Sequence, residues 1–296
     1  MSNFDLTHAR HDAAHCLAPG LFRSLKKGER ETAKLNVVYD YGNRQRVEFS
    51  AIEPLGVDDL RVLQGLIALA GPAGRELPPE PPTDVGQALR KSLEQPPDGA
   101  PGAGADMMVK ASGTAIAVTG SYRSLAREIG YANPRDTLAI RDCVERLWKV
   151  NIIVQNGDRR QGFRLLSHYA SDSATGRLCV ALNPLIASAV AGCGQHVRIE
   201  MDEVRALRTD AARLIHQRLC GWINSGKSGR IGIDALCGYA WPKATANPNT
   251  AKTRRRVVRA ALVELVELGW VVDEYATGKW EIKRPHPHAN STLSAR

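Results

Sequence analysis

The sequence predicts an α+β protein made of two tandem winged-helix domains, with a flexible Pro/Gly-rich insertion in the first domain. Three observations predict this fold. The chain has 296 residues, enough for two domains of ordinary size. Its hydrophobic content of 43% is typical of a globular core. One pattern of short helix, loop, longer amphipathic helix and hairpin occurs at 121–167 and again at 231–284.

The elements before the first copy follow from local patterns. Residues 35–51 alternate apolar and polar on both sides of Gly42 and Asn43, which predicts a β-hairpin. Residues 58–69 have the apolar spacing of a helix. Residues 71–106 hold eight prolines and few large apolar side chains, so we expect a flexible insertion, which a strand-like stretch at 108–118 follows.

The two copies divide the chain. In the first copy, 121–131 and 134–150 predict helices and 151–167 a hairpin. In the second copy, 231–241 and 250–269 predict helices and 270–284 a hairpin. Between them, a strand and a short helix at 177–190 precede a helix at 208–223, which would open the second domain. The predicted boundaries are an N-terminal arm at 1–34, domain 1 at 35–199, domain 2 at 200–285 and a tail at 286–296.

Charge and composition narrow the partners. The net charge of +9 favours a ligand that carries phosphate, such as nucleic acid. No apolar run has the ~20 residues of a membrane span, and the polar N-terminus lacks the apolar stretch of a signal peptide. We therefore expect a cytoplasmic protein with no membrane partner. Its six cysteines are scattered, as small buried side chains in a reducing compartment would be.

The helix at 250–269 is the main functional candidate. Its first ten residues hold five basic side chains, at the end where the helix dipole is already positive. Each cation there opposes the dipole by a few tenths to about 1 kcal/mol, and a DNA duplex in contact with this end would supply the missing negative charge. A solvated helix face is the alternative. The predicted DNA contacts here are Lys252, Arg254, Arg255, Arg256 and Arg259 on the helix, with Lys279 and Lys283 on the wing.

The first copy has a weaker basic signal. Acidic residues dilute the charge of its long helix, so a second DNA contact and a dimerisation surface are equally supported. The candidate DNA-binding residues of this copy are Ser121, Arg123, Arg127, Arg135, Arg141, Arg159 and Arg160.

Two other patterns point to different chemistry. Gly221–Ser228 reads GWINSGKS and matches the phosphate-binding loop of P-loop NTPases, but that loop needs a preceding strand and a following helix, and here a predicted helix precedes it. His8, His11, His15 and Cys16 have spacings that could hold a metal, in a polar stretch that otherwise reads as a mobile arm. No grouping indicates catalysis, so we expect no enzyme, no cofactor and no metal.

Several long blocks resemble one known family. They are AHCLAPGLFRSLKKGER, ERLWKVNIIVQNGDRRQGFRLLSHYAS, VALNPLIA, GQHVRIEMDEVRAL, HQRLCGWI and LCGYAWP. Through them the sequence resembles, along nearly its whole length, the replication protein C family, the origin-binding initiators of IncQ-type broad-host-range plasmids. The insertion at 71–106 and the loop at 243–250 lie where the resemblance is weakest.

The resemblance implies a function. Such initiators recognise direct repeats (iterons) in double-stranded origin DNA, help to open the adjacent duplex and lead to loading of a plasmid-encoded helicase and primase. Related initiators bind iterons as monomers and form homodimers through the first winged-helix domain. From the residues alone, a winged-helix transcriptional repressor stays open as an alternative, and a P-loop NTPase acting through Lys227 is a remote one.

Overall fold

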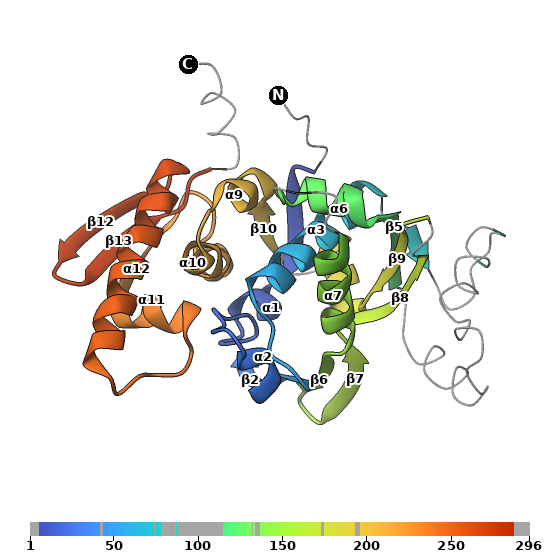
Figure 1. Cartoon of the computed structure of the whole chain (residues 1–296), viewed down its shortest axis with the longest axis horizontal. Helices are drawn as coiled ribbons and strands as arrows, with labels where there is room; N and C mark the ends of the chain where they lie inside the picture. Colours follow the sequence, from blue (N-terminus) through green and yellow to red (C-terminus); the bar gives the residue numbers. More distant parts are fainter. Residues whose placement is uncertain are drawn as a thin grey trace, which may run out of the picture.

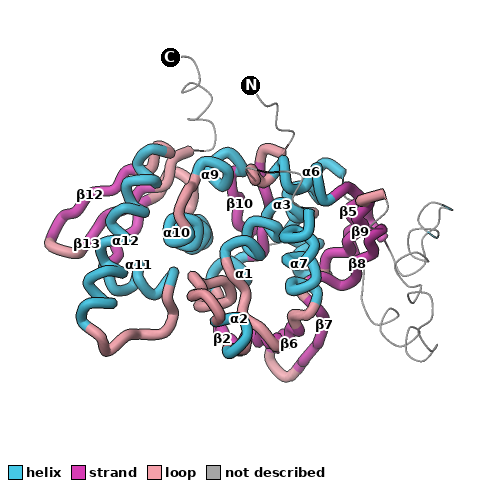
Figure 2. Tube along the Cα trace, viewed as in Figure 1, coloured by secondary structure: helices cyan, strands magenta, loops and turns pink. Residues whose placement is uncertain are grey.

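Four antiparallel sheets and the helices packed on them make up the structure (Figure 1). It is a computed structural model that describes residues 6–41, 44–73, 75–77, 84, 87, 115–131, 133, 137–172, 175–192 and 196–286. In the view of Figure 2, sheets lie at both sides and below, and helices together with one further sheet occupy the middle. Buried side chains from all of these parts form one continuous hydrophobic cluster.

Residues 210–283 have the arrangement of a winged helix. Three helices pack on one another: α10 (Asp210–Trp222), α11 (Ile233–Ala240) and α12 (Pro248–Glu267). The strands are β11 (Ser228–Gly232), β12 (Val271–Ala276) and β13 (Lys279–Lys283), in the order β11-β13-β12. Each predicted element of the second copy is therefore present, and the hairpin turns at Gly278, whose φ of 72° suits glycine.

The same order of elements occurs earlier in the chain. The helices are α3 (Val57–Ala73), α6 (Tyr122–Glu128) and α7 (Thr137–Trp148), all in mutual contact. The strands are β5 (Ala115–Ser121), β8 (Leu166–Asp172) and β9 (Arg177–Leu182), in the order β5-β9-β8. The strand before the second helix pairs with the last strand of the hairpin in both sheets, so β8 and β9 occupy the place of β12 and β13.

The hairpin at 151–167 is therefore not the wing that the sequence pattern predicted. Its strands β6 (Asn151–Asn156) and β7 (Arg159–Arg164) join a different sheet, in the order β2-β3-β6-β7. The other two strands, β2 (Leu35–Tyr41) and β3 (Gln45–Ala51), form the expected first hairpin, whose turn residues Gly42 and Asn43 lie outside the described residues. Phe49 of β3 opposite Ile152 of β6 is buried, and this apolar pairing draws the 151–167 hairpin away from α7.

The start of the predicted insertion belongs to regular structure. Gly71–Ala73 form the last residues of α3, and Arg75–Leu77 form β4, which pairs with β5. Residues 71–73 and 75–77 of the predicted insertion are therefore part of a helix and a strand. Of residues 78–106, all but Asp84 and Gln87 lie outside the described part of the chain, where the predicted flexibility stays a prediction.

The N-terminal segment is folded into the body from Leu6 onward, which corrects the reading of a mobile arm. Strand β1 (His8–Asp12) pairs with β10 (His196–Glu200), and helix α1 (Ala13–Leu17) contacts α10. His11 and His15 are fully buried rather than exposed in a polar arm. The remaining short helices are α2 (Glu29–Thr32), α8 (Pro184–Val190) and α9 (Met201–Ala206).

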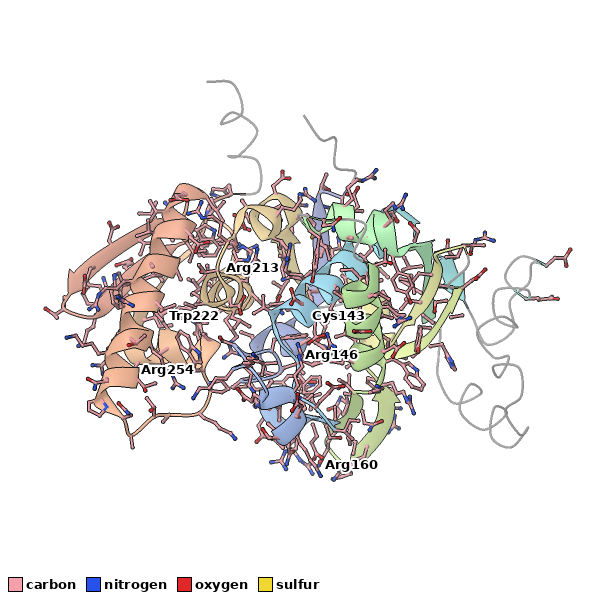
Figure 3. All side chains as sticks on the ribbon, viewed as in Figure 1. Cys143, Arg146, Arg160, Arg213, Trp222 and Arg254 are labelled. Atoms are coloured by element: carbon pink, nitrogen blue, oxygen red, sulfur yellow. The ribbon has the colours of Figure 1, made fainter. Side chains whose placement is uncertain are left out.

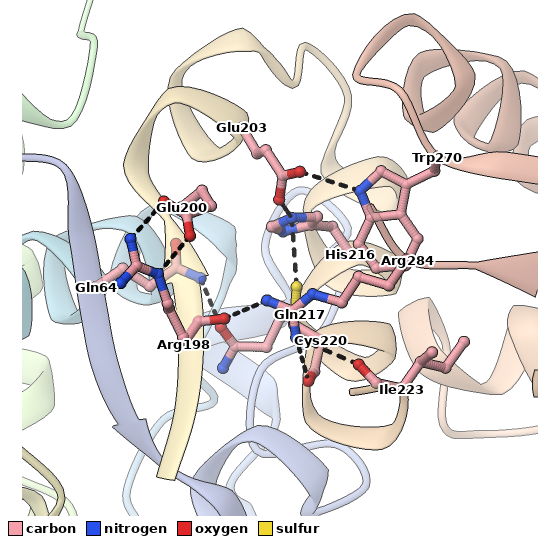
Figure 4. A network of polar contacts seen from close by, with 10 residues as sticks. All are labelled: Gln64, Arg198, Glu200, Glu203, His216, Gln217, Cys220, Ile223, Trp270 and Arg284. Carbon is pink, nitrogen blue, oxygen red and sulfur yellow. Dashed lines mark hydrogen bonds and ion pairs between the residues drawn. The ribbon is translucent and has the colours of Figure 1, made fainter. Parts of the chain in front are cut away.

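A buried polar network joins elements from distant parts of the sequence (Figure 4). Glu203 of α9 bonds to His216 of α10 at 2.6 Å and accepts the Trp270 indole N–H at 3.2 Å. Arg284, just beyond β13, donates to the carbonyls of Cys220 at 2.8 Å and of Arg198 in β10. These bonds connect the strand that pairs with the N-terminal segment to the C-terminal winged helix.

The packing of α3 against α6 leaves no room for a side chain at Gly65 of α3. A Cβ there would collide with the Ile129 side chain and approach Leu125 Cδ1 to 2.8 Å. We expect Gly65→Ala to lower the free energy of unfolding by about 1–3 kcal/mol through overpacking. Gly71→Ala on the same helix is the matched control, because no atom of another part of the chain lies within 4 Å of the place that an alanine Cβ would take. Denaturant titration of both variants tests this, and equal stability would contradict the close α3–α6 contact.

Candidate nucleic-acid interface

Helix α12 begins two residues before the predicted Thr250. The Asn247 side chain accepts bonds from the backbone N–H groups of Asn249 at 2.9 Å and Thr250 at 3.2 Å, and Pro248 is the first helical residue. An asparagine cap followed by proline is a strong start signal, which the sequence reading passed over. The apolar residues facing the core are Val258, Ala261, Leu262 and Leu265.

Two of the predicted arginines on α12 already have partners inside the protein. Arg255 forms an ion pair with Asp234 of α11 at 2.9 Å, with both side chains largely exposed. Arg254 donates to the Lys243 carbonyl at 2.8 Å and lies 5.4 Å from the Trp241 ring centre (Figure 3). Arg254 is therefore partly buried and helps to hold the loop before the helix, and its contact with DNA stays a prediction.

The remaining cations of α12 stay without an acidic partner among the described residues. Lys252, Arg256 and Arg259 are exposed, and Arg259 lies 5.8 Å from the Trp280 ring centre of the wing. Asp234 thus offsets one of the five basic groups in this half of the helix. The face keeps a strong positive potential, which is the electrostatic property that a phosphate backbone requires.

The two wing lysines point away from α12 rather than lying beside it. Side chains alternate along a strand, and the residues of β13 between and beside the lysines are Trp280 and Ile282, both buried toward the helices. Lys279 and Lys283 therefore lie on the outer face of the sheet. Arg230 of β11, which was not among the predicted contacts, shares that face and pairs with Glu281 at 3.1 Å.

The candidates around α6 and α7 have mixed environments. Ser121 caps α6, because its hydroxyl accepts the Ser124 N–H at 3.0 Å. Arg127 pairs with the adjacent Glu128 at 2.8 Å, whereas Arg123 is exposed. Both arginines are exposed, whereas the Glu128 carboxylate is buried.

Helix α7 itself carries the same mixture. Arg141 lies 3.8 Å from Asp142 and 3.9 Å from Glu145, and Leu138 on the same helix is 60% exposed. Arg135 lies outside the described residues. The exposed surface of α7 therefore lacks the single-sign charge of α12.

Arg159 and Arg160 are separated from the first winged helix. Both lie on β7, in the sheet with β2 and β3, and Arg160 pairs with Glu48 of β3 at 3.3 Å. In Figure 3 Arg160 lies at the far end of this hairpin from α7. The prediction that these two residues form a wing beside α7 is wrong, since β8 and β9 occupy that place.

The other chemical candidates have no matching geometry. The GWINSGKS loop follows helix α10 and leads into strand β11, the reverse of the order that a phosphate-binding loop needs. Within the described residues, the one group with several close metal-ligating atoms is Glu203, His216 and Cys220. Its carboxylate and imidazole are bonded to each other at 2.6 Å, as an ion pair would be.

No described helix has the length and apolar character to cross a membrane.

Comparisons with known proteins agree with the resemblance in the sequence. A family model described as "Replication protein C (RepC)" matches residues 3–286. No curated protein matches the chain in a sequence search. Among solved structures, two crystal structures that contain domains 2 and 3 of RctB share the fold. The first is 10% identical to this chain with a TM-score of 0.52, and the match covers 92% of this chain and 98% of that chain. The other is 11% identical with a TM-score of 0.51 and covers 91% and 95%.

A further similar structure is the Pi initiator protein in complex with iteron DNA. It is 14% identical with a TM-score of 0.43, over 56% of this chain and 79% of that one.

Proposed function

The chain belongs to the replication protein C family, and from this premise we propose that it is a plasmid replication initiator that binds iteron DNA at the origin. In this proposal it then promotes origin opening and helicase loading. The observation that carries the proposal is the basic face of α12, where Lys252, Arg256 and Arg259 are exposed without a carboxylate partner in the described structure.

The mechanism is binding rather than catalysis. The recognition helix of such a unit, here α12, enters the major groove with its N-terminal part, where arginine can bond to guanine O6 and N7 or to phosphates. Phosphate contacts orient the protein and base contacts select the site. Deformation of the bound DNA then lowers the cost of opening the neighbouring duplex.

The remaining partners follow from the family. We propose that a plasmid-encoded helicase and primase act after this chain, and that the first winged-helix unit forms a homodimer. The mixed charge around Arg141 and the exposed Leu138 suit a protein contact better than a phosphate backbone. The α12 face is then the principal DNA contact.

A footprint on origin DNA tests the proposal. We expect protected sites repeated at regular intervals, and affinity that falls about 1,000-fold between 50 and 200 mM salt if some six phosphates are contacted. A single protected site next to a promoter, with no support for replication of an origin plasmid, would instead indicate a transcriptional repressor. The absence of any protected duplex would refute both functions.

The Asp234–Arg255 pair yields a gain-of-affinity prediction. Asp234→Asn removes a negative charge at the interface and frees Arg255 to contact DNA. Since exposed ion pairs contribute little to stability, we expect unchanged folding and an affinity for origin DNA raised about three- to ten-fold, measured by fluorescence anisotropy. Asp142→Asn on α7 is the matched control, with a smaller expected effect. Unchanged or weaker binding by Asp234→Asn would show that Arg255 is not at the interface.

A further inference from the structure

The line of exposed side chains on α12 does not end with its cations. Lys252, Arg256, Arg259 and Val263 follow at spacings of four, three and four residues, which places them on one line along the helix. Val263 is 58% exposed, while other residues form the core face of α12. An apolar side chain thus continues the basic line in the same direction.

The length of this line matches a short stretch of duplex. From Lys252 to Val263 it measures about 16 Å at 1.5 Å per residue, close to five base pairs at about 3.4 Å each. Val263 stands one turn beyond Arg259, so an α12 that lies in the groove over this whole length, and not only with its N-terminal part, holds Val263 near the base edges as well. One turn further, the exposed Glu267 pairs with Arg208 at 2.7 Å, and its negative charge marks the end of a surface suited to DNA.

The chemistry of the major groove identifies what an exposed valine can contact there. Thymine is the base whose major-groove edge carries a methyl group. We propose that Val263 packs on the 5-methyl group of a thymine in the bound site and so contributes to base selection. This inference rests on the proposed duplex binding and deepens it by adding an apolar specificity contact to the basic ones.

Removing the methyl group from the DNA tests the contact directly. The probe is a synthetic duplex carrying one footprinted site, in which each thymine is replaced in turn by deoxyuridine. For the wild-type chain we expect one replacement to weaken binding about four-fold, the effect of exposing one methyl group. Val263→Ala should weaken binding to the unmodified duplex similarly, and that one replacement should then cause no further loss.

Val266→Ala is the matched control. Val266 is 50% exposed on the same helix but lies about 60° around it from Val263 and almost one turn further from the basic end, so we expect its variant to keep the full response to deoxyuridine. Alanine is a better helix former than valine, so both variants should fold. Equal deoxyuridine responses in wild type and Val263→Ala, or none in the wild type, would overturn the inference while duplex binding itself survives. Normal DNA binding by Val263→Ala with lost assembly on another protein would also overturn it.

Discussion

Replacing Arg256 and Arg259 together by glutamate is expected to weaken binding to origin duplex by at least about 100-fold. A good arginine contact to a base contributes about 1–3 kcal/mol, so two lost contacts account for this factor, and the new negative charges add repulsion from phosphate. Both side chains are exposed and lack an acidic partner in the described structure, so their loss leaves no buried charge behind. Anisotropy titrations at two salt concentrations measure the change.

The control for this variant is an equal change of charge elsewhere. Lys26 and Lys27 are exposed in the loop before α2, away from α12. Their double replacement by glutamate should reduce affinity only slightly, through the net charge. Thermal unfolding should be near that of wild type for both variants. If the Arg256/Arg259 variant keeps wild-type affinity and the control does not, the interface lies on another surface.

Glu203→Ala is expected to lower the free energy of unfolding by about 3–5 kcal/mol, the usual cost of leaving one partner of a buried ion pair alone. Glu203 and His216 are both almost fully buried, and the carboxylate also accepts the Trp270 N–H at 3.2 Å. Denaturant titration measures the loss. The exposed pair of Asp40 and Arg46 provides the control, because Asp40→Ala should change stability little. If Glu203→Ala and Asp40→Ala lowered the free energy of unfolding by similar amounts, burial of the Glu203–His216 pair would not explain its contribution to stability.

The buried pair of Glu203 and His216 also makes the free energy of unfolding depend on pH. Burial lowers the pKa of His216, but the neighbouring Cys220 and Glu203 outweigh burial and raise the pKa to about 10. Because this value lies above the usual 6.5, the stabilisation is complete below pH 6.5 and is lost as the pH rises toward 10. We expect His216→Gln to be less stable at neutral pH and to lack this alkaline loss. Parallel pH profiles for the two proteins would exclude a charged His216.

Local patterns were sufficient to predict α12. Its apolar face, the cations near its start and the hairpin after it are all encoded within some forty residues. The partner of Arg255 could not be predicted in the same way. Asp234 lies on α11, 21 residues earlier in the chain, and only the packing of the two helices brings the side chains together. The start of the helix does have a local signal, since an asparagine that can cap it, Asn247, stands directly before Pro248.

Two predictions were wrong because they depend on pairing between strands that are distant in the sequence: the wing at 151–167 and the mobile N-terminal arm. The hairpins at 151–164 and 166–182 each consist of two short strands with a positive-φ glycine in the turn, Gly157 and Gly176, and either one could follow α7 as a wing. The choice between them depends on β3 and β5, which lie far away in the sequence. The burial of His11 and His15 depends on β1 meeting β10, and no local signal reveals that contact.

The pairing of β1 with β10 also bears on how the chain folds as the ribosome makes it. His8 emerges first, and its partner Glu200 follows about 190 residues later, which takes about 10–40 s at ordinary rates of synthesis. During that interval the first strand has no native neighbour to bond with. Strand β1 is thus made early but reaches its final place late, and its unpaired backbone groups are open to non-native pairing until β10 is made.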